Sequence, residues 1–171
     1  MTEFSIPTDR SFTILIILNA CGIAGRLLPN LVSDLWLGPL NTMIPLTLIS
    51  SLLIYLWIII VPKHASITGY MVFAGVYGFV SAGVLSVFPA VCASLVPPDK
   101  IQMVGVRLGM IMTCISIPVL VGPPIGGALL QASQGGYLGA QLFFGTVLLV
   151  ALGFLIALRF ARVGRNVLMK I

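Results

Sequence analysis

An arginine at position 26 lies inside an apolar stretch of the chain, where a charged side chain costs several kcal/mol unless it meets a partner or water. Five residues with polar or small side chains share one broad helical face with it: Asn19, Gly22, Pro29, Asn30 and Ser33. The guanidinium is a planar fork of donors that suits carboxylates and phosphates. The spacing therefore predicts an electrostatic clamp for an anionic substrate, with Arg26, Asn19 and Asn30 as substrate-binding residues. The alternative is that Arg26 only snorkels to the headgroups.

Few other residues are suited to catalysis or to metal binding. The only histidine, His64, follows Lys63 in a short connector, and the chain has four acidic residues in total. Cys21, Cys92 and Cys114 each lie in an apolar stretch, without the spacing of a zinc site. We therefore expect a protein that is not an enzyme and that needs no metal or cofactor.

Five long apolar stretches must position the arginine. Apolar residues make up 59% of the chain and charged residues 8%, far fewer than in a soluble domain. A spanning helix needs about 20 mainly apolar residues. The sequence predicts an all-α polytopic membrane bundle over residues 11–160, after a short N-terminal segment (1–10) and before a basic cytoplasmic tail (161–171). The expected spans are 11–33, 42–61, 68–96, 106–130 and 139–158.

The basic residues predict the orientation of these spans. One side of the membrane would hold most of them: Lys100, Arg107, Arg159, Arg162, Arg165 and Lys170, with Arg26 close by. The other side would hold Arg10 and Lys63. Positive residues accumulate on the cytoplasmic side, so the N-terminus should face outside and the C-terminus the cytosol. The bases are scattered rather than clustered, so we expect no nucleic-acid partner.

Proline and glycine interrupt two of the spans. Pro89 in the third span is a candidate for a bend, whereas packing is the plainer interpretation of the glycines in that span. The fourth span carries Pro118, Pro123 and Pro124, each of which removes a backbone donor. A hinge for alternating access and a static bend are equally good interpretations. The gating or helix-bending candidates are Asp34, Pro89, Gly122, Pro123, Gly126 and Gly127.

Residues 18–30 read LNACGIAGRLLPN, and Asp34, Gly38-Pro39 and Asn41 follow them. This segment resembles the eighth helix and following loop of fungal monocarboxylate-transporter-like members of the major facilitator superfamily. The resemblance implies that Arg26 binds the substrate carboxylate. Animal monocarboxylate carriers have an aspartate one turn earlier, which takes part in proton coupling. The position is Gly22 here, so the chain lacks that pair.

Three segments, the first of them the loop just named, are similar to further motifs of the same superfamily. Asp34 and Gly38 match parts of the loop motif G-x-x-x-D-R-x-G-R, which makes Asp34 a gating candidate, whereas a solvated loop residue is the plainer interpretation. Residues 97–110 resemble the connector between helices ten and eleven. Residues 122–127, GPPIGG, match the G-P-x-x-G-G core that drug/proton antiporters carry in helix five, the pseudo-symmetric counterpart of helix eleven.

The resemblance covers about residues 11–160 and implies helices eight to twelve of a twelve-helix carrier. The expected function is secondary transport, by symport or efflux, of small organic anions such as monocarboxylates or acidic secondary metabolites, by a truncated chain that is inactive alone. The alternatives are a homodimeric transporter or channel and a membrane subunit without transport activity. Expected partners are the organic anion, membrane lipids, and a missing N-terminal half or a second copy. The expected location is the plasma membrane.

Overall fold

The structure, a computed structural model, describes residues 8–60, 67–133 and 136–163. The connector with Lys63 and His64, most of the N-terminal segment and the tail after Val163 lie outside the described residues. The described part is almost entirely helical and contains five helices long and apolar enough to cross a membrane. The predicted all-α membrane bundle is confirmed.

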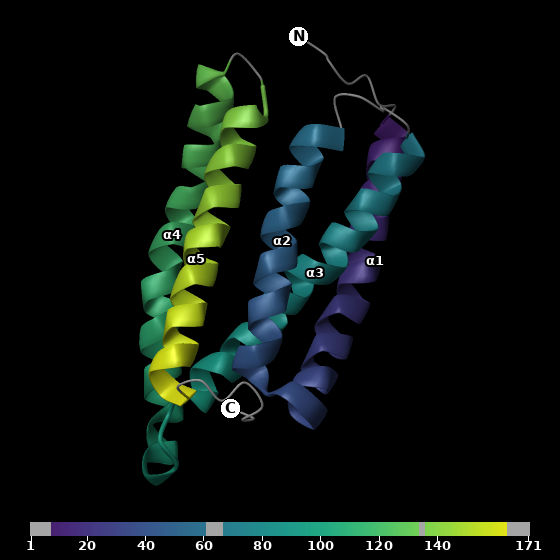
Figure 1. Cartoon of the computed structure of the whole chain (residues 1–171). Coiled ribbons are helices and arrows are strands. Elements are labelled where there is room, and N and C mark those ends of the chain that lie inside the picture. The colour runs from purple at the N-terminus through teal and green to yellow at the C-terminus, as the bar shows by residue number, and fades with distance from the viewer. Residues whose placement is uncertain (1–7, 61–66, 134–135, 164–171) are drawn as a thin grey trace.

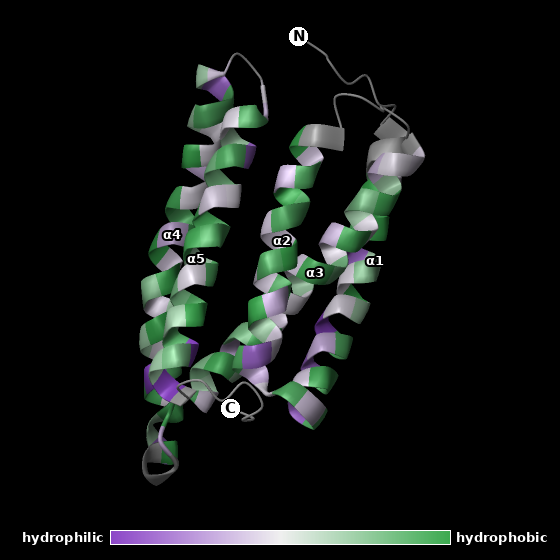
Figure 2. Ribbon diagram, in the orientation of Figure 1, coloured by the Kyte–Doolittle hydropathy of each residue, from purple (hydrophilic) through white to green (hydrophobic). Residues whose placement is uncertain are grey.

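The five helices are α1 (Thr8–Val32), α2 (Pro39–Ile60), α3 (Ile67–Ser94), α4 (Val104–Ala132) and α5 (Leu138–Val163). Successive helices run in opposite directions, and α3 is steeply inclined relative to its neighbours (Figure 1). Hydrophobic residues predominate along the helices, with hydrophilic residues scattered between them (Figure 2), and many large hydrophobic side chains are exposed. Lipid is the solvent that such a surface requires.

The first connector differs from the prediction. The sequence predicted a loop from about residue 34 to 41, but α1 continues directly into a π-helical segment, Ser33–Leu37. Gly38 then reverses the chain with a φ of 82°, a left-handed conformation that glycine adopts without strain, and α2 begins at Pro39. The fall in hydropathy at Asp34 predicted a loop there, whereas the backbone remains helical to Leu37. Asp34 therefore lies within the helical segment.

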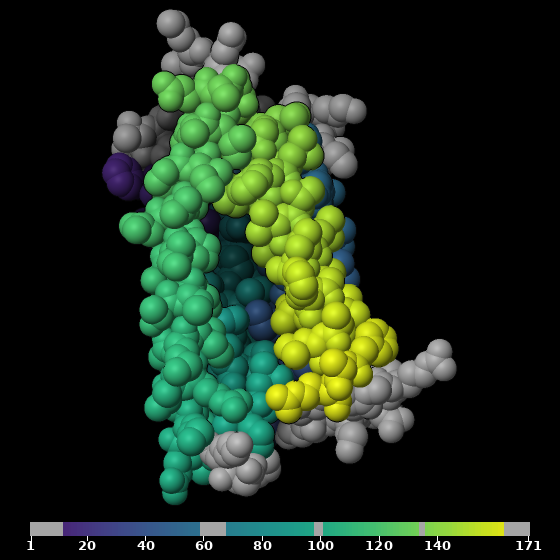
Figure 3. Space-filling model, turned by 90° about the vertical axis from the view of Figure 1, so that its left-hand side faces the viewer, coloured from purple at the N-terminus to yellow at the C-terminus, as the bar shows by residue number. Residues whose placement is uncertain are grey.

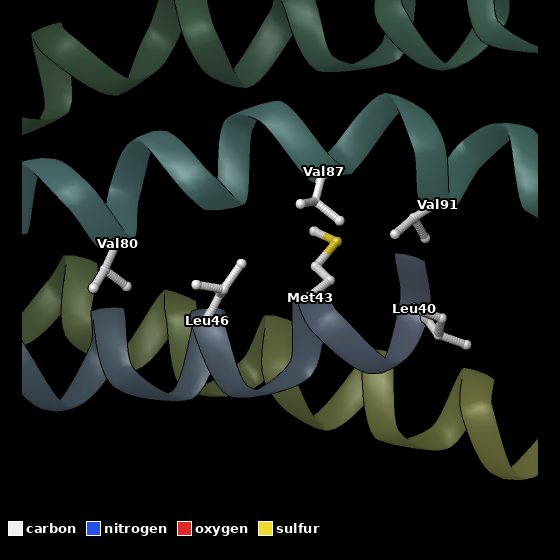
Figure 4. Close-up of a cluster of buried hydrophobic side chains, with 6 residues drawn as sticks. All are labelled: Leu40, Met43, Leu46, Val80, Val87 and Val91. Carbon is white, nitrogen blue, oxygen red and sulfur yellow. The ribbon is translucent and has the colours of Figure 1, made fainter. Parts of the chain in front are cut away.

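Helices that are far apart in sequence form the main contacts. α1 packs along α3, and α2 packs on both α3 and α5, whereas α1 and α2 barely touch. Six buried side chains of α2 and α3 form a central cluster (Figure 4): Leu40, Met43, Leu46, Val80, Val87 and Val91. The bundle core is thus the interface between α2 and α3.

Glycine permits the close approach of α1 and α3. A Cβ atom at Gly25 would overlap the main chain of Phe79, and one at Gly78 would overlap the carbonyl of Leu18. Small residues commonly allow such contact between membrane helices, because dispersion and hydrogen bonds replace the hydrophobic effect there. The two backbones therefore lie against one another without side chains between them.

α4 is the least embedded helix. It contains no buried residue. Its three prolines do not interrupt it, since the helix is continuous from Val104 to Ala132. In the space-filling view a hollow separates α4, in green, from α5, in yellow (Figure 3). The gating candidates on α4 therefore lie at the edge of the bundle.

Candidate anion-binding site

Arg26 lies on α1 with an exposed side chain. Its guanidinium forms no hydrogen bond or ion pair with the residues that the structure describes. Helical structure continues for eleven residues beyond it, to Leu37, which corresponds to about 16 Å at the rise of an α-helix. The arginine is therefore further from the end of its span than the sequence predicted, which weakens the snorkelling interpretation.

The polar face predicted around Arg26 divides into two parts. Gly22, Pro29 and Ser33 are buried within the bundle, whereas Asn19 and Arg26 are exposed. Asn30 is half-buried between these two groups, at the border of the α1–α3 contact. Only the edge formed by Asn19, Arg26 and Asn30 remains open to a ligand.

Asn30 connects this edge to α3. Its side-chain nitrogen Nδ2 donates to the main-chain oxygen of Arg26 at 2.9 Å and to Oγ of Ser86 at 2.5 Å. The Ser86 hydroxyl in turn donates to the same Arg26 oxygen at 3.2 Å. Asn19, by contrast, donates to the carbonyl of Leu15 in its own helix at 2.8 Å.

Ser86 is the residue that sequence reasoning missed. From the sequence, Ser86 is only a polar residue within an apolar span. Nothing in the spacing within α3 shows which part of α1 it meets, because that depends on how the two helices cross. A serine in an otherwise apolar span is nonetheless a weak signal of a contact between helices.

Gly22, one turn before Arg26, faces α3. A Cβ atom there would lie 3.5 Å from Cβ of Ala82 and 3.6 Å from the carbonyl of Gly78. A carboxylate at this position would therefore begin in the contact between the helices rather than on the open edge beside Arg26.

The gating candidates do not gather around Arg26. Asp34 is exposed within the π-helical segment, and Pro89 is half-buried inside the continuous helix α3. On α4, a Cβ atom at Gly126 would lie 3.5 Å from the ring of Phe144 on α5. Gly122 and Gly127 face open space, and Pro123 is exposed. A bending role of these residues remains a prediction.

An apolar groove lies along the same pair of helices. It has a volume of about 570 Å³ and is lined by Ile17, Cys21, Ala24, Met71, Val72, Gly75, Val76 and Phe79. By helical spacing, Ile17, Cys21 and Ala24 lie on the side of α1 away from Arg26 and Asn30. The groove offers no charged group for an anion, so it does not compete with Arg26 as the candidate site.

A second arginine connects two helix ends. Nη2 of Arg162, near the end of α5, donates to the carbonyl of Leu95 at 2.8 Å, just after α3 ends. From the sequence, Arg162 contributed only to the predicted orientation of the spans. The structure adds a hydrogen bond that holds the ends of α3 and α5 together.

The five membrane-length helices and the charged edge of α1 define a multi-pass integral membrane protein. An MFS-type transporter of Gibberella zeae is 36% identical over 90% of this chain. The aspyridones efflux protein of Emericella nidulans is 35% identical over 84% of the chain, and the agnestins efflux protein of Paecilomyces divaricatus is 33% identical over 93%. The chain belongs to the major facilitator superfamily (MFS), a superfamily of membrane transporters.

These similarities cover most of this chain but only part of each relative. The matched regions are 33%, 28% and 34% of the three relatives, so the chain spans about a third of their length. No protein-family model and no solved structure matches the chain.

Proposed function

We propose that this chain forms helices eight to twelve of a monocarboxylate-porter-like secondary carrier, in which Arg26 binds the anionic group of the substrate. The observation that carries the proposal is an exposed guanidinium within a membrane span that has no partner among the described residues. Ionisable residues in spans almost always face a bundle interior or a watery cavity and mark the pathway of a substrate or ion. Asn19 and Asn30, on the same edge, would add polar contacts.

The substrate class follows from the arginine and from the relatives. A guanidinium fork selects carboxylates and similar anions. Two relatives are named as efflux proteins, for aspyridones and for agnestins. We propose a small organic acid as substrate, either a monocarboxylate or an acidic secondary metabolite, with transport outward across the membrane.

The proposed transport path requires more than this chain. α4 buries no residue, and the chain spans about a third of the relatives' length. Carriers of this kind enclose the substrate between two structural repeats. We propose that the missing surface comes from the N-terminal half of a longer carrier; a second copy of the chain is the alternative occupant.

The proposed location is the plasma membrane, with the N-terminus outside and the C-terminus in the cytosol. Seven basic residues, Arg26 included, fall on or near one side and two on the other, and the positive-inside rule assigns the richer side to the cytosol. The domain division into 1–10, 11–160 and 161–171 belongs to the same proposal.

The test of this function uses a completed carrier. The chain is joined to the part of the Gibberella zeae relative that it does not match, and saturable flux of benzoate and lactate is measured in membrane vesicles. Arg26→Leu should abolish saturable flux. Arg26→Lys keeps the charge but loses the bidentate fork, so it should raise the half-saturating concentration about tenfold.

The matched control is Arg107, an exposed arginine near the start of α4. Arg107→Leu and Arg107→Lys should leave the half-saturating concentration unchanged at equal amounts of protein in the membrane. If the Arg26→Leu carrier reaches the membrane and transports normally, Arg26 is a snorkelling anchor and the site assignment is wrong.

A further inference from the structure

The main-chain oxygen of Arg26 accepts hydrogen bonds from two side chains that belong to different helices. Asn30, from the same helix, donates to it at 2.9 Å, and Ser86, from α3, donates to it at 3.2 Å. Asn30 uses its second N–H on Oγ of Ser86 at 2.5 Å. The three groups thus form a closed set: the Arg26 oxygen accepts from both side chains, and Oγ of Ser86 accepts the second N–H of Asn30.

This set lies where α1 is weakest as a helix. Pro29 has no N–H, so the carbonyl of Gly25 loses the donor that it would otherwise meet one turn later. That carbonyl faces Gly83 of α3, where a Cβ atom would lie 3.1 Å from it. Hydrogen bonds from neighbouring helices commonly compensate for proline in a span. Ser86 donates to the next carbonyl along the chain, that of Arg26, rather than to the carbonyl of Gly25 that Pro29 leaves without its donor.

The contribution of Ser86 differs from that of Asn30. The bond from Asn30 to Arg26 lies within α1 and would persist if α1 moved relative to α3. The bonds of Ser86 cross between the helices, so they fix the height and rotation of residue 26 relative to α3. The Cα–Cβ direction follows from the backbone, so this placement sets where the guanidinium leaves the helix.

We propose that Ser86 is a positioning residue for Arg26: together with Asn30 it ties the Arg26 main chain to α3 and so holds the guanidinium on the open edge of α1, where it meets the anion. Ser86 does not itself touch the substrate. The inference rests on the proposed anion-binding role of Arg26, which is why its test reads the placement of the positive charge rather than transport.

The test uses the whole chain in membranes, with Cys21, Cys92 and Cys114 replaced by alanine and with Asn19→Cys as a reporter. Position 19 is exposed, on the same edge as Arg26 and about 10 Å from it along the helix. Two reagents of opposite charge label the reporter, sulfonatoethyl and trimethylammonioethyl methanethiosulfonate. The measured quantity is the ratio of the anionic to the cationic labelling rate, which rises with positive potential at the reporter.

Arg26→Leu should lower this ratio about fourfold, as Coulomb attraction and repulsion over 10 Å predict even at the dielectric constant of water. The comparison at position 86 uses Ser86→Thr and Ser86→Val. Threonine and valine have nearly the same shape, but only threonine keeps the hydroxyl. Ser86→Val should lower the ratio by about half of that effect on a logarithmic scale, roughly twofold, whereas Ser86→Thr should keep the ratio of the parent.

The matched control is Ser81→Ala, because Ser81 lies on the same helix and donates to the carbonyl of Gly78 within that helix at 3.4 Å. Its ratio should equal that of the parent. Asn30→Ala combined with Ser86→Val should lower the ratio no more than the larger single effect, since both side chains act on one carbonyl.

Equal ratios for Ser86→Val and Ser86→Thr, with a lowered ratio for Arg26→Leu, would overturn the positioning role and leave the proposed function in place. A parent that reacts with a membrane-permeant maleimide but with neither charged reagent would also overturn it, since residues 19 and 26 would then share no aqueous surface. A lowered labelling ratio in Ser86→Val, together with normal substrate flux in the completed carrier with Arg26→Leu, would separate the two proposals. Ser86 would then position Arg26, but Arg26 would not bind the substrate.

Discussion

Gly25 of α1 lies directly against the main chain of Phe79 on α3, without space for a side chain between them. This contact sets the distance between the two helices that carry Arg26 and Ser86. It also depends on a single missing Cβ atom, because the obstructing group is a backbone carbonyl that cannot move without displacing its helix.

Gly25→Ala should therefore lower the free energy of unfolding by about 2 kcal/mol or more, through overpacking that forces the backbones apart. Unfolding in mixed detergent micelles by titration with dodecyl sulfate, followed by circular dichroism, measures the change. The control is Gly109→Ala on α4, where a Cβ atom would meet open space. It should be neutral or stabilising by up to about 1 kcal/mol, because alanine is the better helix former. Equal effects at the two positions would contradict the tight contact.

Val87 is fully buried in the cluster between α2 and α3. Val87→Ala should destabilise the chain by about 1 kcal/mol, because it leaves a cavity. The loss should be smaller than in a soluble core, since lipid is as apolar as the protein interior and only packing is lost. Val72 on the same helix is 63% exposed, and Val72→Ala should change stability by less than the error of the titration.

Arg162 donates to the carbonyl of Leu95, which follows the end of α3. Carbonyls at a helix end lack donors from their own helix, and Pro98 cannot supply one three residues later. Arg162→Leu should lower the free energy of unfolding by about 0.5–1 kcal/mol, a modest value because the pair is exposed. Thermal unfolding in detergent, with Arg107→Leu as control, checks this. No difference between the two variants would show that solvent replaces the bond.

Single cysteines test the orientation at two positions outside the described residues, His64→Cys and Leu168→Cys. The first follows α2 and the second follows α5, helices that end on opposite sides of the bundle (Figure 1). A membrane-impermeant maleimide should label position 64 from outside intact cells and position 168 only after permeabilisation. Labelling of both from one side would contradict the five-span topology, and the reverse pattern would contradict the proposed orientation.

The existence of five spans follows from the sequence, because the length and apolar character of a segment suffice for a membrane helix and need no knowledge of its neighbours. The placement of Arg26 inside the first span follows for the same reason. The end of that span does not. Asp34 lowers the hydropathy, yet the backbone stays helical to Leu37 and turns only at Gly38.

The tertiary structure alone decided which helices meet. In a membrane both lipid-facing and buried side chains are apolar, so hydropathy does not show which side of α1 packs, or that it packs on α3 rather than on the adjacent α2. Helical spacing grouped Gly22 with Arg26, but the crossing of α1 and α3 buries the first and exposes the second. The same crossing brings Ser86 to the carbonyl of Arg26 from sixty residues away, a contact that depends on the distance and angle between two backbones and on no local feature of either helix.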